Sequence, residues 1–254
     1  VETISDVPIK WMDEGLDKVT LEKFKLKESA PDLDKWKNFL HRLKNPTHQI
    51  SIGLVGKYVE LDDSYKSILE SLIHAGAENE VKVVVSSIHS EYLEKENIAK
   101  NLRLLDGIIV APGFGQRGLD GKILAVEYAR VNNIPFLGIC VGMQMAVIEY
   151  ARNVKKMRYA NSTEISEKCK DPVIDLMISQ KEIINKGGTM RLGAWDCEIE
   201  KNTVSYKSYK KKLISERHRH RYEFNNSYTN KIFDDKFILA GLNPETKLVE
   251  IVEN

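Results

Sequence analysis

Residues 135–154, PFLGICVGMQMAVIEYARNV, decide the fold of this chain. They begin with an apolar run of strand length, PFLGIC, and continue almost at once with an amphipathic segment of helix length, GMQMAVIEYARNV. Cys140 ends the strand, and Gly138 and Gly142 lie two residues to either side of it. Because glycine allows the backbone to turn tightly, this stretch predicts a strand, a sharp turn at Cys140 and a helix.

The same alternation of strand and helix patterns is found upstream. The apolar runs lie at 50–58, 81–88 and 107–114, and the amphipathic segments at 64–76, 92–105 and 121–133. Such alternation is typical of a parallel sheet with crossover helices, in which ligands bind at the carboxyl ends of the strands. After Val154 the chain becomes polar, and we expect short strands and loops added to one side. The predicted fold class is α/β, with a doubly wound, mostly parallel sheet, flanking helices and a small added strand and loop region.

Residues 1–46 form a charged, helical preface to this pattern. The clearest helix is DLDKWKNFLHRL at 32–43, which Asp32 can cap. Its apolar residues fall on one face, which must pack against another element. Asn45, Pro46 and Thr47 then break the pattern. We therefore predict a domain boundary between a helical segment, 1–46, and a domain at 47–254.

The charge of the chain excludes some classes of partner. There are 38 basic and 37 acidic residues, so no global field favours nucleic acid or a membrane surface. The basic tract at 207–212 has little aromatic interleaving, and we interpret it as a solvated loop. No signal peptide is indicated, and the longest apolar stretch, 136–148, is shorter than the ~18 residues of a membrane span. We expect neither nucleic acid nor membrane as a partner.

The chain has three cysteines, Cys140, Cys169 and Cys197, at wide and irregular spacing. An odd number at such spacing favours a reducing compartment over a disulfide framework. We therefore predict a cytoplasmic protein.

Cys140 is the first candidate for chemistry. A helix N-terminus favours the thiolate and can lower a cysteine pKa below its free value of ~8.5. The N–H of Val141 can stabilise an oxyanion, and so can that of Gly113 in the loop APGFGQRG, 111–118, which should lie at the same edge of the sheet. From the residues alone, a buried structural cysteine and a glycine-rich turn without a ligand remain open alternatives.

The turn GICVGMQ, 138–144, resembles the G-[IV]-C-x-G-x-Q turn of the class I glutamine amidotransferases, which have a flavodoxin-like fold. Further stretches resemble the amidotransferase domain of the CTP synthases, and together they cover essentially the whole chain. They are SIGLVGKYVELDDSYKSI, GFGQRG, ANSTE, PVIDLM, GGTMRLGAW and ERHRHRYEFN. The preface is similar to the end of that family's synthetase domain and its linker.

The resemblance implies a role for each matching residue. Cys140 would form a glutamyl thioester, with Gly113 and Val141 as oxyanion donors. A carboxylate at Glu164 and a guanidinium at Arg221 suit the ammonium and carboxylate of a zwitterion. The implied glutamine-binding residues are Gly113, Val141, Gly142, Met143, Gln144, Glu164 and Arg221.

The family resemblance also implies a glutamine-hydrolysing ligase, which supplies ammonia for the ATP-dependent amination of UTP to CTP. No cofactor and no metal are expected in this domain. ATP and Mg²⁺ are expected in the family's synthetase domain, which this sequence does not contain, and GTP as an allosteric activator. The partners implied are L-glutamine, the synthetase domain and, in the full-length protein, a homotetramer.

The sequence departs from the family pattern in three places. Val141 replaces a commoner leucine, and Pro112 replaces a frequent glycine, which leaves the oxyanion role to Gly113. The family's general base, a histidine in an HPE segment followed by its glutamate, is expected beyond Asn254, so the domain is expected to be truncated and slow in turnover.

His218 and His220 are the histidines nearest to the matching motifs. They alternate with arginines in an apparent strand, so the two residue types should point to opposite faces. We interpret the histidines as structural or interface residues. A non-catalytic amidotransferase-like module for regulation or oligomerisation, or a cysteine hydrolase of other γ-glutamyl substrates, are the alternative functions.

Overall fold

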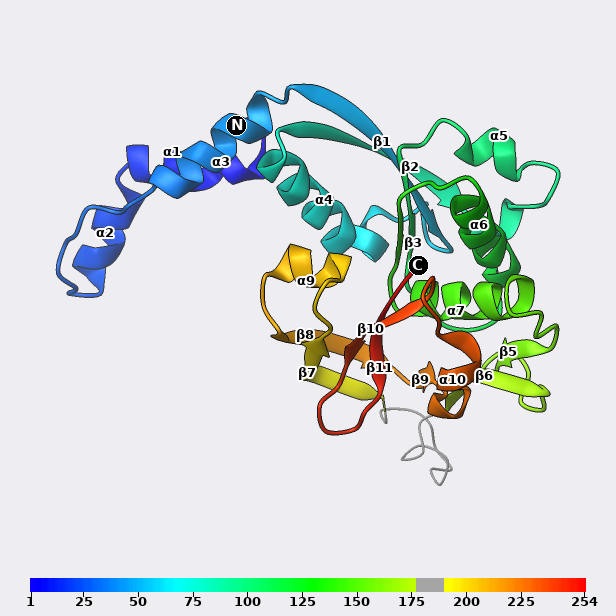
Figure 1. The fold of residues 1–254 in the computed structure, drawn as a ribbon. Coiled ribbons are helices and arrows are strands. Elements are labelled where there is room, and N and C mark those ends of the chain that lie inside the picture. Colours follow the sequence, from blue (N-terminus) through cyan, green and yellow to red (C-terminus); the bar gives the residue numbers. More distant parts are fainter. Residues whose placement is uncertain (177–189) are drawn as a thin grey trace. The chain divides into compact units, whose positions relative to one another are not determined.

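A computed structural model of the chain describes residues 1–176 and 190–254 (Figure 1). The first residues of the GGTMRLGAW motif, 187–189, lie outside the described residues, as does the end of PVIDLM. The chain divides into two compact units. One consists of Val1–Ser51 and Lys66–Val85, and the other of Ile52–Tyr65 and Ser86–Asn254. The predicted boundary between 46 and 47 stays a prediction.

The first unit is mainly helical. Asp32 accepts a hydrogen bond of 3.1 Å from the N–H of Asp34, and α3 begins there. The apolar stripe of α3 packs against α4, since the ring of Phe39 meets that of His74 edge-on at 5.6 Å. The helices of this unit are η1 (Ile4–Asp6), α1 (Val7–Asp13), α2 (Leu16–Lys23), α3 (Asp34–Lys44) and α4 (Lys66–Glu78).

The predicted parallel sheet is confirmed, with the strand order β2-β1-β3-β4. Its strands are β1 (His48–Gly56), β2 (Val81–His89), β3 (Gly107–Val110) and β4 (Phe136–Gly138). β3 lies between β1 and β4 and pairs in parallel with both, so the carboxyl ends of β3 and β4 share one edge. The connecting helices include η2 (Asp62–Tyr65), η3 (Ser90–Tyr92), α5 (Ile98–Leu102), α6 (Leu119–Val131) and α7 (Val141–Asn153). Of the helix expected at 92–105, only α5 forms.

The core of the second unit fills the space between this sheet and its helices. β3 is buried along its whole length, as expected for a central strand covered on both faces. Among the residues that pack in the core are Val55, Ile108, Val110, Met145, Ile148 and Phe224.

The added region consists of two smaller sheets. A four-stranded sheet has the order β11-β10-β7-β8, and a three-stranded sheet has the order β5-β6-β9. The strands are β5 (Ala160–Ser162), β6 (Asp171–Leu176), β7 (Arg191–Ile199), β8 (Leu213–His220), β9 (Tyr222–Phe224), β10 (Ile238–Leu242) and β11 (Val249–Glu253). The helices here are α9 (Val204–Tyr209), η4 (Asn226–Tyr228) and α10 (Thr229–Ile232).

The basic tract at 207–212 begins in α9 rather than in a loop. The helix forms because the side chain of Thr203 caps it by accepting from the N–H of Tyr206 at 3.0 Å. Lys210, Lys211 and Lys212 follow the helix and are exposed, as predicted for a solvated segment. None of the helices in residues 1–176 and 190–254 has the length and hydropathy of a membrane span.

Candidate active site

Cys140 occupies the turn between β4 and α7 as the N-cap of the helix. Its backbone is strained, with φ 56° and ψ −108°, which is rare for a residue with a Cβ. The turn requires its two glycines because the backbone passes very close to them. A Cβ at Gly138 would lie 2.6 Å from the carbonyl carbon of Gly142, and one at Gly142 would clash with the carbonyl oxygen of Val110.

The protonation of Cys140 differs from the sequence-based expectation. Burial raises the pKa of its thiol, and the carboxylates of Glu164 and Glu223 act in the same direction. A hydrogen bond from the N–H of Val141 and the positive charge of Lys122 oppose this effect without overcoming it. The prediction of a lowered pKa is therefore wrong, because burial outweighs the N–H of Val141 at the helix N-terminus.

The loop that contains Gly113 follows β3, directly beside the Cys140 turn. The Ala111 N–H donates to Val55 O at 2.9 Å, and the Ile139 N–H donates to Val110 O at 3.0 Å. These backbone bonds align the end of β3 with the residue that precedes Cys140. The structure therefore brings Gly113 and Cys140 to the same edge of the sheet, as predicted.

Two buried lysines hold this loop by its backbone carbonyl groups. Lys122, on α6, is fully buried and donates to Ala111 O at 2.6 Å. Lys57, which follows β1, is 2% exposed and donates to Phe114 O at 2.7 Å and to Gly115 O at 2.6 Å. A lysine so deeply buried normally needs such partners. The two side chains thus fix the loop at both ends of Gly113.

Neither lysine was among the residues predicted from the sequence. Lys122 lies on the buried face of α6 with Ala125, Val126 and Ala129. A lysine among apolar residues of one helix face was the feature of the sequence that could have indicated a buried lysine. Burial, followed by the charge of Lys57, lowers the pKa of Lys122 to about 7. The charge of a Cys140 thiolate raises that pKa, so the ammonium and the thiolate stabilise each other.

The predicted glutamine-binding residues lie around the same edge of the sheet. Glu164 accepts a hydrogen bond of 2.7 Å from the N–H of Gly115, and its charge acts on Cys140. Burial raises the pKa of the Tyr222 phenol, Glu164 raises it further, and Arg221 lowers it. Glu164 and Arg221 are therefore both close enough to Tyr222 to act on one group.

Three further predicted residues lie in the first turn of α7. Gln144 is buried, and its amide donates to Tyr222 O at 2.9 Å, which ties α7 to β9. Gly142 and Met143 precede it in the same turn. The roles of all these residues in binding glutamine stay predictions.

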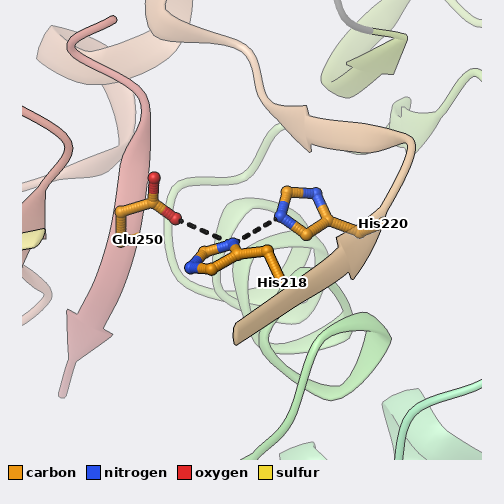
Figure 2. Close-up of side chains that lie close together, drawn as sticks. All are labelled: His218, His220 and Glu250. Atoms are coloured by element: carbon orange, nitrogen blue, oxygen red, sulfur yellow. Dashed lines mark hydrogen bonds and ion pairs between the residues drawn. The ribbon is translucent and has the colours of Figure 1, made fainter. Parts of the chain in front are cut away.

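His218 and His220 lie on one face of β8, and Nδ1 of His218 lies 2.7 Å from Nε2 of His220 (Figure 2). Burial lowers the pKa of both imidazoles, that of His220 to about 4. They belong to a buried cluster with Arg191, Glu223 and Glu250. Burial also raises the pKa of Glu223 to about 8, with Glu250 adding to the shift and Arg191 opposing it. Arg191, Glu223 and Glu250 were not among the residues predicted from the sequence.

The chain is similar to proteins of known family. The family model for glutamine amidotransferase class-I matches residues 60–254. A CTP synthase from Christiangramia forsetii is 59% identical over 252 residues, which are 99% of this chain and 46% of that protein. A CTP synthase from Methanocaldococcus jannaschii is 51% identical over 257 residues, which are 99% of this chain and 48% of that protein. The chain thus spans about half the length of these curated relatives.

One solved structure is similar in both sequence and fold. It is the glutaminase domain of the Trypanosoma brucei CTPS with bound acivicin. The two chains are 38% identical with a TM-score of 0.74, and the match covers 81% of each.

Proposed function

Because this chain belongs to the class I glutamine amidotransferase family, in which it matches the glutaminase domain of CTP synthase, we propose that it cleaves the side-chain amide of L-glutamine through a thioester on Cys140. The observation that carries the proposal is the strained turn at Cys140. Cys140 caps α7 with a positive φ, next to the first N–H groups of the helix, and the N–H of Val141 acts to lower the pKa of the thiol. Nucleophile and oxyanion donor therefore meet in one turn.

The proposed reaction begins with attack of the Cys140 sulfur on the amide carbon. The carbonyl oxygen becomes an oxyanion, which accepts hydrogen bonds from the N–H groups of Gly113 and Val141. The C–N bond then breaks, the thiol proton leaves with the nitrogen as ammonia, and water later cleaves the thioester to glutamate. Since burial favours the protonated thiol, the reaction needs a base. We propose the histidine that the family carries in an HPE segment, expected to follow Asn254.

The proposed recognition of glutamine uses opposite charges at its amino-acid end. Glu164 faces the ammonium and Arg221 the α-carboxylate, while Gly142, Met143 and Gln144 line the first turn of α7. Glu164 is positioned for this role by its bond to the Gly115 N–H, which places a carboxylate next to the Gly113 loop. The approach of the substrate ammonium would use the remaining acceptor capacity of this carboxylate.

The activity of the whole protein is a further part of this proposal. The relatives of about twice the length are CTP synthases, which supports a synthetase domain that uses ATP and Mg²⁺ to aminate UTP with the released ammonia. We also propose a homotetramer, with GTP as the activator. Cys140, Cys169 and Cys197 are all free thiols, which supports a cytoplasmic location.

Trapping with hydroxylamine tests the proposed thioester. Hydroxylamine converts a glutamyl thioester to γ-glutamyl hydroxamate, so product depends on the nucleophile. In the protein extended past Asn254, so that the proposed base is present, we expect hydroxamate from the wild type and from the control Cys169→Ser, and none from Cys140→Ser. Equal product from Cys140→Ser would overturn the assignment.

A further inference from the structure

Three side chains outside the proposed glutamine site direct donor atoms toward one another (Figure 2). His218 and His220 project from β8, and Glu250 projects from β11. His218 Nδ1 lies 2.7 Å from His220 Nε2 and 3.5 Å from Glu250 Oε2. All three ligand atoms lie within 4.8 Å of one another, close enough for small movements to bring them onto one ion.

His220 and Glu250 each have a second polar partner, on the side that faces away from the centre of the cluster. His220 Nδ1 lies 3.2 Å from Glu223 Oε1, so the ring is held between a carboxyl group and the cluster centre. The second oxygen of Glu250, Oε1, forms an ion pair of 2.7 Å with Arg191, whose other nitrogen donates to Glu223 at 3.3 Å. Metal-binding histidines usually present their second nitrogen to a carboxylate or carbonyl oxygen, and ligating carboxylates are themselves held by hydrogen bonds.

The cluster is shielded from solvent. The side chains of His218 and His220 are 14% and 13% exposed, and that of Glu250 is 4% exposed. The guanidinium of Arg191 in this cluster faces the carboxyl groups of Glu223 and Glu250. A cation at the centre would complete the balance of charge when both carboxyl groups are ionised.

We propose that His218, His220 and Glu250 bind a divalent transition-metal ion of the zinc type, with Glu223 and Arg191 orienting the ligands. Two imidazoles and one carboxylate suit Zn²⁺, and a water molecule can take the fourth position. The ion takes the place of the hydrogen bond between the two rings. Each neutral imidazole keeps its one proton on the ring nitrogen that faces away from the ion, so ligation releases no proton from the rings. Ligand nitrogens around tetrahedral zinc lie about 3.3 Å apart, so the two rings separate slightly when the ion enters.

The ion would connect strands that are not neighbours. β8 and β11 occupy the two ends of the strand order in their sheet. A bond from each to one ion therefore ties the two edges together, and binding to the folded state alone raises the unfolding temperature. The family resemblance implied no metal in this domain, and Glu250 was not among the residues predicted from the sequence.

Titration of the whole chain with Co²⁺ tests the site, because tetrahedral Co²⁺ absorbs visibly and a thiolate ligand adds a charge-transfer band. We expect one equivalent bound without that band. Binding should be lost in His218→Ala and His220→Ala and retained in the control His48→Ala, which removes an exposed histidine of β1. Glu223→Gln should bind about 10-fold to 100-fold more weakly.

A second measurement on the wild type covers the case in which a variant does not fold. In ¹⁵N spectra of the imidazoles, Zn²⁺ should shift His218 Nδ1 and His220 Nε2 selectively. The proposal would be overturned if these two nitrogens did not shift, if the wild type bound no stoichiometric ion, or if Co²⁺ gave a thiolate band. Full binding by folded His218→Ala would overturn it as well. A hydrogen bond between the two rings would then explain the cluster.

Discussion

The ammonium group of Lys122 donates a hydrogen bond of 2.6 Å to the carbonyl oxygen of Ala111, two residues before Gly113. Lys122 does not need to touch the substrate to affect the reaction. It fixes the strand end from which the Gly113 loop starts, and its charge favours the Cys140 thiolate. Both effects depend on one buried side chain of α6, which lies outside the GICVGMQ motif at 138–144.

Replacing Lys122 by methionine should separate stability from activity. We expect hydroxamate formation to fall about 100-fold, because the loop loses its anchor and the thiolate its neighbouring charge. The midpoint of urea unfolding should change little, since the loss of a hydrogen bond is offset by the removal of a costly buried amine. The control Lys100→Met changes an exposed lysine and should alter neither quantity. Unchanged hydroxamate formation in Lys122→Met would contradict this role.

The same lysine predicts how stability depends on pH. The pKa of Lys122 is about 7 in the folded chain against 10.5 for an unperturbed lysine. Between these values the unfolded state binds one more proton, so this group makes the folded state more stable as pH rises. The free energy of unfolding should therefore rise with pH more steeply in the wild type than in Lys122→Met, by up to about 1.4 kcal/mol per pH unit. Urea unfolding at several pH values measures both slopes, and identical slopes would refute the lowered pKa.

Much of the fold follows from the sequence because its signals are local. Strand and helix patterns alternate within short windows, and the two glycines around Cys140 act on their immediate neighbours. The raised pKa of Cys140 and the bonds from Lys57 and Lys122 could not be predicted in the same way. They depend on burial and on segments that meet only in the folded chain, and the contact of Glu250 with His218 has the same origin.

Glu164 should determine the affinity for glutamine. Glu164→Gln retains an oxygen that can accept from the Gly115 N–H, but it loses the charge that we propose to face the substrate ammonium. We expect glutamine to protect Cys140 from alkylation only at concentrations about 10-fold to 100-fold higher than in the wild type. Glu167→Gln, at an exposed position of the same segment, is the matched control. An equal loss of protection in both variants would show that Glu164 has no specific role.

Arg191 should be important for stability. Its removal leaves the carboxyl groups of Glu223 and Glu250 buried without their guanidinium partner. We expect Arg191→Met to lower the free energy of unfolding by about 3 kcal/mol, as measured by urea denaturation. Arg158→Met removes an exposed arginine and should have an effect below about 0.5 kcal/mol. Equal effects of the two substitutions would argue against a role for the buried ion pairs.

The central claim is that Cys140 is the nucleophile for glutamine, and covalent labelling tests it most directly. The chain is treated with 6-diazo-5-oxo-norleucine, a reactive glutamine analogue, digested, and analysed by mass spectrometry. The account predicts one adduct, on the peptide that contains Cys140, and its disappearance when glutamine is in excess. Labelling of Cys169 or Cys197 with Cys140 unmodified would contradict it.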